Sequence, residues 1–433
     1  MTIEENQQRL RKKRRKNIFN MVFVLVVAIV AIYLTLKDNY QEVYAAFMES
    51  DWRFIVIILA VIFLYFSIDG FIFFILARLY TTRYKWHRGL AVTLIGAFHA
   101  GISPSNSGGQ FAQAATMKRQ KIDISSAASI LVMYFIIYQI VLVCFGVVAI
   151  IFKFDILIKN AEPISLFGIN VQVWLLALIG FLFNGIVIST LLLLSNSKPL
   201  HNFIINKGIG FFGKIKLVRQ VDRTRARVRI AVENFRIELR RLQSNVPVLV
   251  LLLLLFSLRF LALYSIPYLV GRMMMLPMNT YIIEGAYVVG KSLYADTVFL
   301  NSFLQMITGI LPLPGGAGVS EYFYERLFAS VYLNPTLTEV SLEANIGYLH
   351  AGQILWRFIT FYFGLLVGGA VTAFYRSSME KEIDAEFASK TFAEIKAETM
   401  ATRTATSETM VNTSTLSVQE IRRKLTGRRD DEP

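Results

Sequence analysis

The sequence predicts an all-α, polytopic integral membrane protein. Of its 433 residues, 55% are hydrophobic and only 17% carry a charge, whereas a soluble domain has about 25% charged residues. The mean hydropathy of the chain is +0.51. Apolar runs long enough to cross a bilayer as helices recur along the sequence. Basic residues are gathered in blocks beside these runs, as in cytoplasmic loops that face anionic lipid.

Six apolar runs are expected to span the membrane. The chain begins with a basic segment, 1–17, and the first apolar run follows it directly. Because that run is long for the apolar part of a secretory signal, we expect a retained helix. The expected spanning helices are residues 18–36, 52–79, 124–152, 171–194, 246–270 and 346–374.

The distribution of charge predicts the side on which each loop lies. The basic N-terminus and the basic segment 198–245 are expected in the cytoplasm, and the acidic loop 37–51 outside. Basic residues flank 89–117 on both sides, so this region is expected to enter and leave by the same face as a re-entrant hairpin. Residues 280–332 then form a second hairpin from the opposite face, and the C-terminus returns to the cytoplasm.

The transmembrane domain, expected at 18–375, divides into two similar halves of opposite orientation, 18–152 and 171–375. Each half has two spans, a hairpin and a third span. The hairpin turns also resemble each other, with GISPSNSGGQ at 101–110 and GILPLPGGAG at 309–318. An inverted repeat with broken helices is typical of transporters. The alternative is that Gly and Pro only kink ordinary spans.

The two turns are the candidate substrate-binding site. A helix that begins after each turn would aim its free N–H groups at the membrane centre, which suits an anion such as a lipid phosphate. Ser107 with Gln110, and more weakly Gly318 with Glu321, have the spacing of a helix cap. Alternatively, the polar residues only satisfy the broken backbone. The candidates are Ser103, Ser105, Asn106, Ser107, Gly108, Gly109, Gln110, Gln113, Asn301, Pro312, Pro314, Gly315, Gly316, Gly318 and Glu321.

Three ionisable residues within the spans complete the candidate site: Asp69, Arg259 and Arg357. A charge at the centre of a membrane helix costs about 2.5–3.5 kcal/mol, so each should face the protein interior and have a partner. We expect that Arg259 or Arg357 contacts an anionic headgroup, or that one of them pairs with Asp69 or Glu321. Purely structural ion pairs are the alternative.

Other site chemistry is not indicated. The single cysteine lies within an apolar run, and there is no phosphate-binding loop for a nucleotide. We therefore expect no catalytic residues, no metal and no cofactor. The segment 198–245 alternates basic and apolar residues, which favours an amphipathic helix on anionic inner-leaflet lipid over nucleic-acid binding. The Ser- and Thr-rich tail 376–433 is predicted to be cytoplasmic and disordered.

Two motifs are similar to those of a known family. SPSNSGGQFAQA at 103–114 and LPLPGGAGVSE at 311–321 resemble the transmembrane region of the lysylphosphatidylglycerol synthase family, the flippase-like half of bacterial multiple-peptide-resistance proteins. The resemblance covers about 15–375 and implies a multi-pass protein of the bacterial plasma membrane. Full-length members also carry a cytoplasmic acyltransferase domain that transfers lysine from lysyl-tRNA to phosphatidylglycerol. The segments 198–245 and 376–433 are too short for that domain, so we expect the translocation half alone.

The expected function is therefore movement of a lipid between leaflets. The lipid would be an anionic phospholipid, an aminoacyl-phosphatidylglycerol, a glycolipid or a polyprenyl-linked lipid, and the resemblance implies a link to antimicrobial peptide resistance. One alternative is the family's lysyltransferase activity, with a separately encoded domain. Another is a scaffold for cell-envelope synthesis that transports nothing. Expected partners are the lipid itself, a second copy of the chain or a separate lipid-synthesising enzyme.

Overall fold

The computed structural model describes most of the region between the expected first span and the tail. The described residues are 41, 44, 47–103, 106–160, 164–166, 169–196, 236–276, 280–283, 286–289, 293–309, 316, 318–329, 331–332 and 342–375. They lie within one compact unit, Met21–Tyr375. The expected first span, most of the basic segment 198–245 and the tail lie outside the described residues.

The described part confirms a multi-pass membrane protein. Five of its helical stretches are long and apolar enough to cross a bilayer, and they match five of the six predicted runs to within a few residues. These stretches are Trp52–Arg78, Ile124–Asp155, Val173–Thr190, Val246–Met273 and Gly347–Phe374. The first is helix α3 (Trp52–Arg78), the second lies in α6 (Ile124–Asn160) and the third in α7 (Val173–Asn196).

The last two stretches are interrupted helices. The fourth consists of α11 (Val246–Tyr264) and α12 (Ile266–Met273), which meet at Ser265, with a proline near the start of α12. The fifth consists of α15 (Leu342–Arg357), a π-helical segment (Phe358–Tyr362) and α16 (Phe363–Phe374). A π-helical segment inserts an extra residue into a turn and is frequently found at functional sites.

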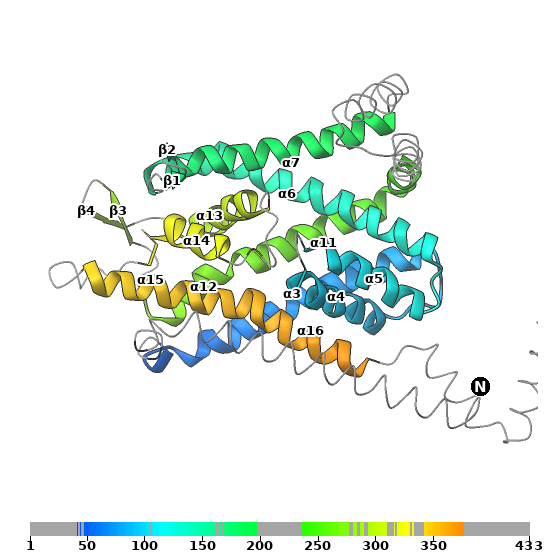
Figure 1. Ribbon diagram of the computed structural model, residues 1–433, viewed down its shortest axis with the longest axis horizontal. Coiled ribbons are helices and arrows are strands. Elements are labelled where there is room, and N and C mark those ends of the chain that lie inside the picture. The colour runs from blue at the N-terminus through cyan, green and yellow to red at the C-terminus, as the bar shows by residue number, and fades with distance from the viewer. Residues whose placement is uncertain are drawn as a thin grey trace, which may run out of the picture. The chain divides into compact units, whose positions relative to one another are not determined.

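Four shorter helices form two helical hairpins. The first hairpin consists of α4 (Trp86–Gly101) and α5 (Ser107–Arg119), and the second of α13 (Leu293–Thr308) and α14 (Val319–Phe328). The two helices of each hairpin pack on each other. Figure 1 shows the first hairpin near one end of the long helices and the second near the other end.

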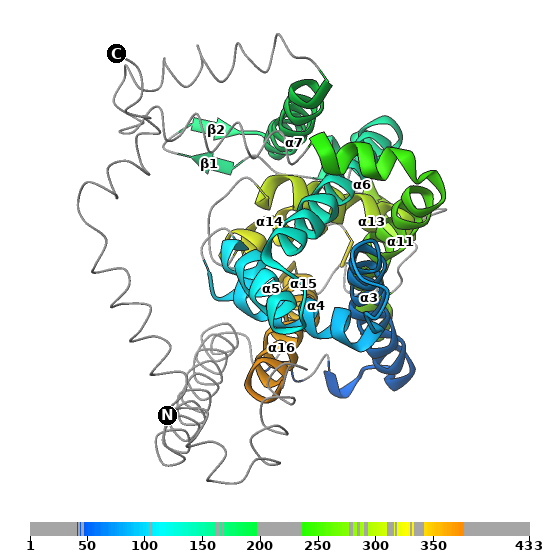
Figure 2. The same ribbon diagram turned by 90° about the vertical axis from the view of Figure 1, so that its right-hand side faces the viewer.

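Close backbone contacts hold the first hairpin against its neighbours. A Cβ atom at Gly89 of α4 would lie 2.2 Å from the carbonyl oxygen of Gly70 in α3. A Cβ atom at Gly368 of α16 would lie 2.3 Å from the carbonyl oxygen of Leu94 in α4. Helix α16 accordingly lies beside α4 in both views (Figures 1 and 2). Small residues at such interfaces are how membrane helices approach closely.

Aromatic packing dominates around the second hairpin. The ring of Tyr324 in α14 stacks on Phe328 at 4.4 Å and on Trp356 of α15 at 4.5 Å between ring centroids. The Tyr324 hydroxyl is 2.6 Å from the hydroxyl of Tyr332, which donates to the carbonyl oxygen of Pro267 in α12. The second hairpin is thereby fixed to α15 and α12.

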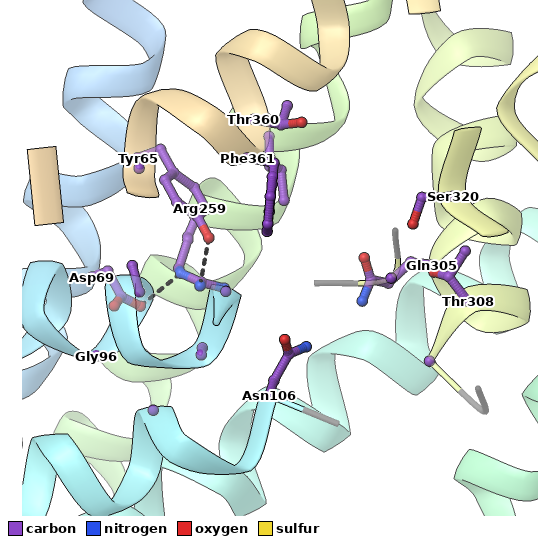
Figure 3. Close-up of a pocket in the computed structure, with 18 of the residues that line it drawn as sticks. Tyr65, Asp69, Gly96, Asn106, Arg259, Gln305, Thr308, Ser320, Thr360 and Phe361 are labelled. Carbon is purple, nitrogen blue, oxygen red and sulfur yellow. Dashed lines mark hydrogen bonds and ion pairs between the residues drawn. The ribbon is translucent and has the colours of Figure 1, made fainter. Parts of the chain in front are cut away.

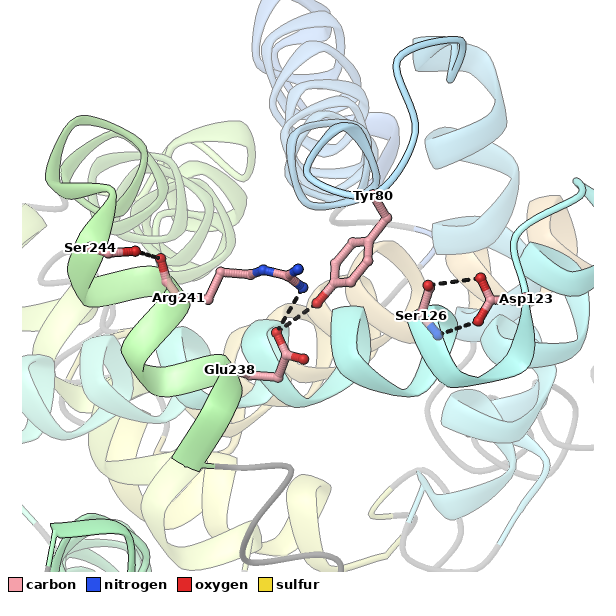
Figure 4. A network of polar contacts seen from close by, with 6 residues as sticks. All are labelled: Tyr80, Asp123, Ser126, Glu238, Arg241 and Ser244. Atoms are coloured by element: carbon pink, nitrogen blue, oxygen red, sulfur yellow. Dashed lines mark hydrogen bonds and ion pairs between the residues drawn. The ribbon is translucent and has the colours of Figure 1, made fainter.

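Polar contacts organise one end of the bundle, at the bases of α3, α6 and helix 236–244 (Figure 4). Asp123 caps α6 by accepting hydrogen bonds from the backbone N–H and the hydroxyl of Ser126, which lower the pKa of Asp123. The Tyr80 hydroxyl donates to Glu238 at 2.6 Å, and the guanidinium of Arg241 lies 4.4 Å above the Tyr80 ring. Burial, more than the bond to Glu238, raises the pKa of Tyr80 to about 12.

The expectation of an all-helical fold needs one small correction. Two antiparallel two-stranded hairpins occur between the long helices: β1 (Ile164–Leu166) with β2 (Ile169–Val171), and β3 (Thr280–Ile283) with β4 (Ala286–Val289). Both are short and rich in Ile, Val and Tyr, residue types that favour strands.

Candidate functional site

A cavity of about 630 Å³ lies between the turns of the two hairpins. Asn106 and Gly109 reach it from the first turn, and Gly316 and Ser320 from the second. Its other walls come from α3, α4, α6, α7, α11, α13 and the last span. Figure 3 shows Asp69 and Arg259 on one side and Gln305, Thr308 and Ser320 on the other.

The first charged group in the wall is a fully engaged carboxylate. Asp69 on α3 is only 4% exposed, and its Oδ1 lies 2.6 Å from Nε of Arg259 on α11. The same oxygen accepts a hydrogen bond from the Tyr134 hydroxyl at 2.6 Å, and Oδ2 accepts one from Thr93 at 2.9 Å. One ion pair and two hydrogen bonds therefore compensate for the burial of a side chain that is costly to bury alone.

The same contacts fix the orientation of Arg259. Its Nη2 donates to the Tyr65 hydroxyl at 2.8 Å, and its guanidinium carbon lies 4.6 Å from the centre of the Tyr65 ring. The rings of Tyr138 and Phe260 lie within about 6 Å on other sides. Figure 3 shows the guanidinium facing the space between Asn106 and Phe361. Arg259 thus presents a preorganised cationic edge to the cavity.

A second ion pair joins the second hairpin to the last span. Nε of Arg357 lies 2.7 Å from Oε1 of Glu321, the third residue of α14. The guanidinium of Arg357 also lies 4.2 Å from the centre of the Phe361 ring. The other carboxylate oxygen of Glu321, Oε2, is buried without a hydrogen-bond partner. The sequence-based expectation that one arginine would pair with Asp69 or Glu321 is confirmed, and both arginines form such pairs.

The profile of a membrane-protein family matches residues 21–368 of the chain, and its description is lysylphosphatidylglycerol synthase TM region. The chain belongs to this family. The match covers four of the five spanning stretches in full and the fifth as far as residue 368. It also covers both hairpins and the cavity, and it confirms the resemblance seen in the two turn motifs. No curated protein matches the chain.

Half of the candidate residues line the cavity of this lysylphosphatidylglycerol synthase TM region. Those in its wall are Asp69, Asn106, Gly109, Gln110, Gln113, Arg259, Asn301, Gly316 and Arg357. Those outside its wall are Ser103, Ser107, Gly108, Gly318 and Glu321. Ser105, Pro312, Pro314 and Gly315 lie outside the described residues.

The predicted cap at the first turn is wrong. Helix α5 includes Ser107, and no side chain of the preceding residue, Asn106, caps it. The hydroxyl of Ser103 instead accepts a hydrogen bond from the backbone N–H of Gly108 at 2.8 Å. Asn106 has the left-handed backbone conformation, with φ of 55°, which reverses the chain so that Ser103 reaches the start of α5. The Ser103 hydroxyl therefore satisfies the backbone N–H of Gly108, and neither residue lines the cavity.

The predicted cap at the second turn is also wrong, for a different reason. Gly318 does precede α14, but no side chain caps the helix there, because Glu321 is directed to Arg357. Gly316 and Gly318 have φ of +67° and +79°, conformations that glycine adopts without the penalty a Cβ atom would impose. Gly316 and Gly318 are thus explained by backbone geometry.

Sequence reasoning missed several polar residues of this cavity. The hydroxyl groups of Tyr65, Thr93 and Tyr134 satisfy the buried ion pair, and Thr308, Ser320 and Thr360 also line the wall. Tyrosine is common at membrane–water interfaces and threonine between packed membrane helices, so their positions gave no signal. Among the described residues, no three potential metal ligands lie together.

Proposed function

We propose that the chain is a lipid translocase in which a polar headgroup crosses the membrane through the cavity while the acyl chains remain in lipid. The observation that carries the proposal is the cavity itself. It lies between the turns of two short hairpins and contains two arginines that come from spanning helices. Charged groups at such depth are retained where a substrate or ion passes.

The dimensions of the hairpins support a position near the membrane midplane. The helices α4, α5, α13 and α14 contain 16, 13, 16 and 10 residues. At 1.5 Å per residue they are about 15–24 Å long, less than the roughly 30 Å hydrocarbon core. We infer that both hairpins are re-entrant, from opposite faces. Exposed Lys118 and Arg119 at the base of the first favour a cytoplasmic base.

The lining favours a phosphate-containing or glycosylated headgroup. Arg259 offers a cationic edge, and the amides of Asn106, Gln110, Gln113 and Asn301 offer hydrogen bonds to phosphate oxygens or sugar hydroxyls. A volume of about 630 Å³ falls within the usual 300–1,000 Å³ of small-molecule sites. It suits a headgroup but not a pair of acyl chains in addition.

The family description leaves a second candidate, a contribution to lysyl-phosphatidylglycerol synthesis. In that case the cavity would hold phosphatidylglycerol for a separate acyltransferase. Both candidates need a lipid headgroup at Arg259, but only the first moves lipid in the absence of lysyl-tRNA.

The test is leaflet exchange in proteoliposomes that contain the purified chain. Headgroup-labelled phosphatidylglycerol, lysyl-phosphatidylglycerol and diglucosyl lipid are each followed by loss of signal to an impermeant quencher. Arg259→Lys keeps the charge but loses the planar fork that holds Asp69, Tyr65 and the headgroup together. The matched control is Arg272→Lys, because Arg272 is exposed and lies outside the cavity wall.

Exchange of one lipid, slowed by Arg259→Lys and unchanged by Arg272→Lys, is the expected result. Folding of each variant is checked by its thermal midpoint in detergent. Failure of folded wild-type protein to exchange any of the three lipids would reject the translocase and favour the synthesis candidate or a scaffold.

A further inference from the structure

A second acid–base pair lies next to the Glu321–Arg357 pair, between the same two helices. Nε2 of His350 on α15 is 3.7 Å from Oε1 of Glu325 on α14. Glu321 and Glu325 are four residues apart on α14, and His350 and Arg357 are seven apart on α15. Both spacings place side chains on one face of a helix. The four residues therefore form a continuous row between α14 and α15.

The exposure of the row increases away from the cavity. At the cavity end, the side chains of Arg357 and Glu321 are 7% and 18% exposed. In the second pair, those of His350 and Glu325 are 28% and 36% exposed. Seven residues of α15 correspond to about 10 Å along the helix axis. The row thus leads from the cavity wall towards the surface at the base of the second hairpin.

The cavity end of the row has an unused acceptor. Oε1 of Glu321 pairs with Arg357, but Oε2 is buried without a hydrogen-bond partner. Buried acceptors are rarely left in this state in folded proteins, and binding a proton would turn this oxygen into a donor. Among the described residues, Arg326 also acts on Glu325, and Tyr362 acts on Arg357.

We propose that this row is a proton path and that it couples lipid movement to proton movement. A proton on Nε2 of His350 passes to the carboxylate of Glu325. It then passes to Oε2 of Glu321, across a gap that one water molecule would bridge, since side chains four residues apart on a helix are about 5–6 Å apart at Cβ.

Protonation of Glu321 has a defined consequence at the cavity. The neutral carboxyl group no longer holds Arg357 by charge, so that the guanidinium becomes available to an anionic headgroup. Release of the headgroup on the opposite side restores the ion pair, and Glu321 then gives its proton to water in the cavity, which is open to that side. One phosphate and one proton cross together, so no net charge is moved through the membrane. The inference rests on the proposed function and adds its energy source.

The test uses the same proteoliposomes, now loaded with a pH-sensitive dye and clamped at zero membrane potential. Dye fluorescence reports proton uptake after external acidification, and quenching reports lipid exchange with and without the pH gradient. His350→Arg keeps a nitrogen donor opposite Glu325 but cannot release a proton at these pH values. Glu325→Gln removes the other proton carrier. Asp123→Asn, at the exposed cap of α6, is the control.

The expected result is that wild-type protein and Asp123→Asn take up protons and exchange lipid faster under the gradient. His350→Arg and Glu325→Gln should lose both effects while keeping their folded state, as judged by thermal midpoint. Proton uptake that is absent in wild type, or unchanged in both variants, would overturn the path. Lipid exchange at the same rate with and without the pH gradient would overturn the coupling but remain consistent with a lipid translocase. Proton uptake lost in both variants without any lipid exchange would support the path and reject the translocase.

Discussion

Replacement of Asp69 by Asn should destabilise the protein strongly, although it changes the volume of the side chain very little. Asp69 is 4% exposed, forms an ion pair with Arg259 and accepts hydrogen bonds from Tyr134 and Thr93. An amide has only one oxygen to accept with, so the substitution leaves a buried guanidinium without its counter-charge and at least one hydroxyl without an acceptor. Removing one partner of a buried ion pair costs about 3–5 kcal/mol.

A matched control exists on the same helix. Asp51 caps α3 through a hydrogen bond from the N–H of Arg53, at an exposed position. Asn caps helices about as well as Asp, so Asp51→Asn should change the free energy of unfolding by only about a few tenths of a kcal/mol. The comparison holds the chemical change constant and varies only the environment of the carboxylate.

The assay is equilibrium unfolding in mixed micelles, followed by far-UV circular dichroism. It compares the single variants Asp69→Asn, Asp51→Asn and Arg259→Gln with the double variant Asp69→Asn/Arg259→Gln. The double variant should be less destabilised than the sum of its single variants, with a coupling energy of about 1–3 kcal/mol. A cost below about 1 kcal/mol for Asp69→Asn, or additive effects, would refute the claim that this ion pair is buried and mutually dependent.

Two further predictions concern packing and topology. Gly89→Ala should lower the thermal midpoint, at a cost of about 1–3 kcal/mol for overpacking, because its Cβ atom would lie 2.2 Å from a carbonyl oxygen of α3. Gly185→Ala, with nothing within 4 Å, should be neutral or slightly stabilising, and equal effects would argue against the close approach of α3 and α4. In a background where the single cysteine is replaced (Cys144→Ala), Glu49→Cys should react with an impermeant maleimide from outside intact cells, and Lys118→Cys only after the cells are opened. Both positions are exposed, so the reverse pattern would overturn the proposed topology.

The positions of the spanning helices followed from the sequence because a long apolar run has few alternatives in a membrane. The predicted run 246–270 corresponds to Val246–Met273, and 346–374 to Gly347–Phe374. The charged residues within spans were informative for the same reason, since the cost of burying them requires a partner. That argument predicted that Arg259 or Arg357 would contact a headgroup or that one of them would pair with Asp69 or Glu321, and in the structure both form ion pairs.

The choice of hydrogen-bond partners did not follow from the sequence. Tyr65 and Tyr134 are separated by about 70 residues in the chain and meet at Arg259 and Asp69 only because α3, α6 and α11 pack together. Nothing in the local pattern distinguishes these tyrosines from those at a lipid surface. The predicted cap at the first turn was wrong for a related reason: the turn geometry at Asn106, not the capping-box spacing, decides which hydroxyl reaches the free N–H.

The π-helical segment Phe358–Tyr362 changes the angular phase of the last span. In a continuous α-helix, Gly364 would lie about 20° from the direction of Arg357, seven residues earlier, because each residue turns the helix by about 100°. One extra residue moves that direction by about a further 100°. Arg357 can therefore face Glu321 of the second hairpin while Gly364 packs against Phe66 and Gly368 against α4. The last span can thereby contact both halves of the protein. Deleting one residue from the π-helical segment would rotate one end of the span relative to the other, so that the two sets of contacts could not form together.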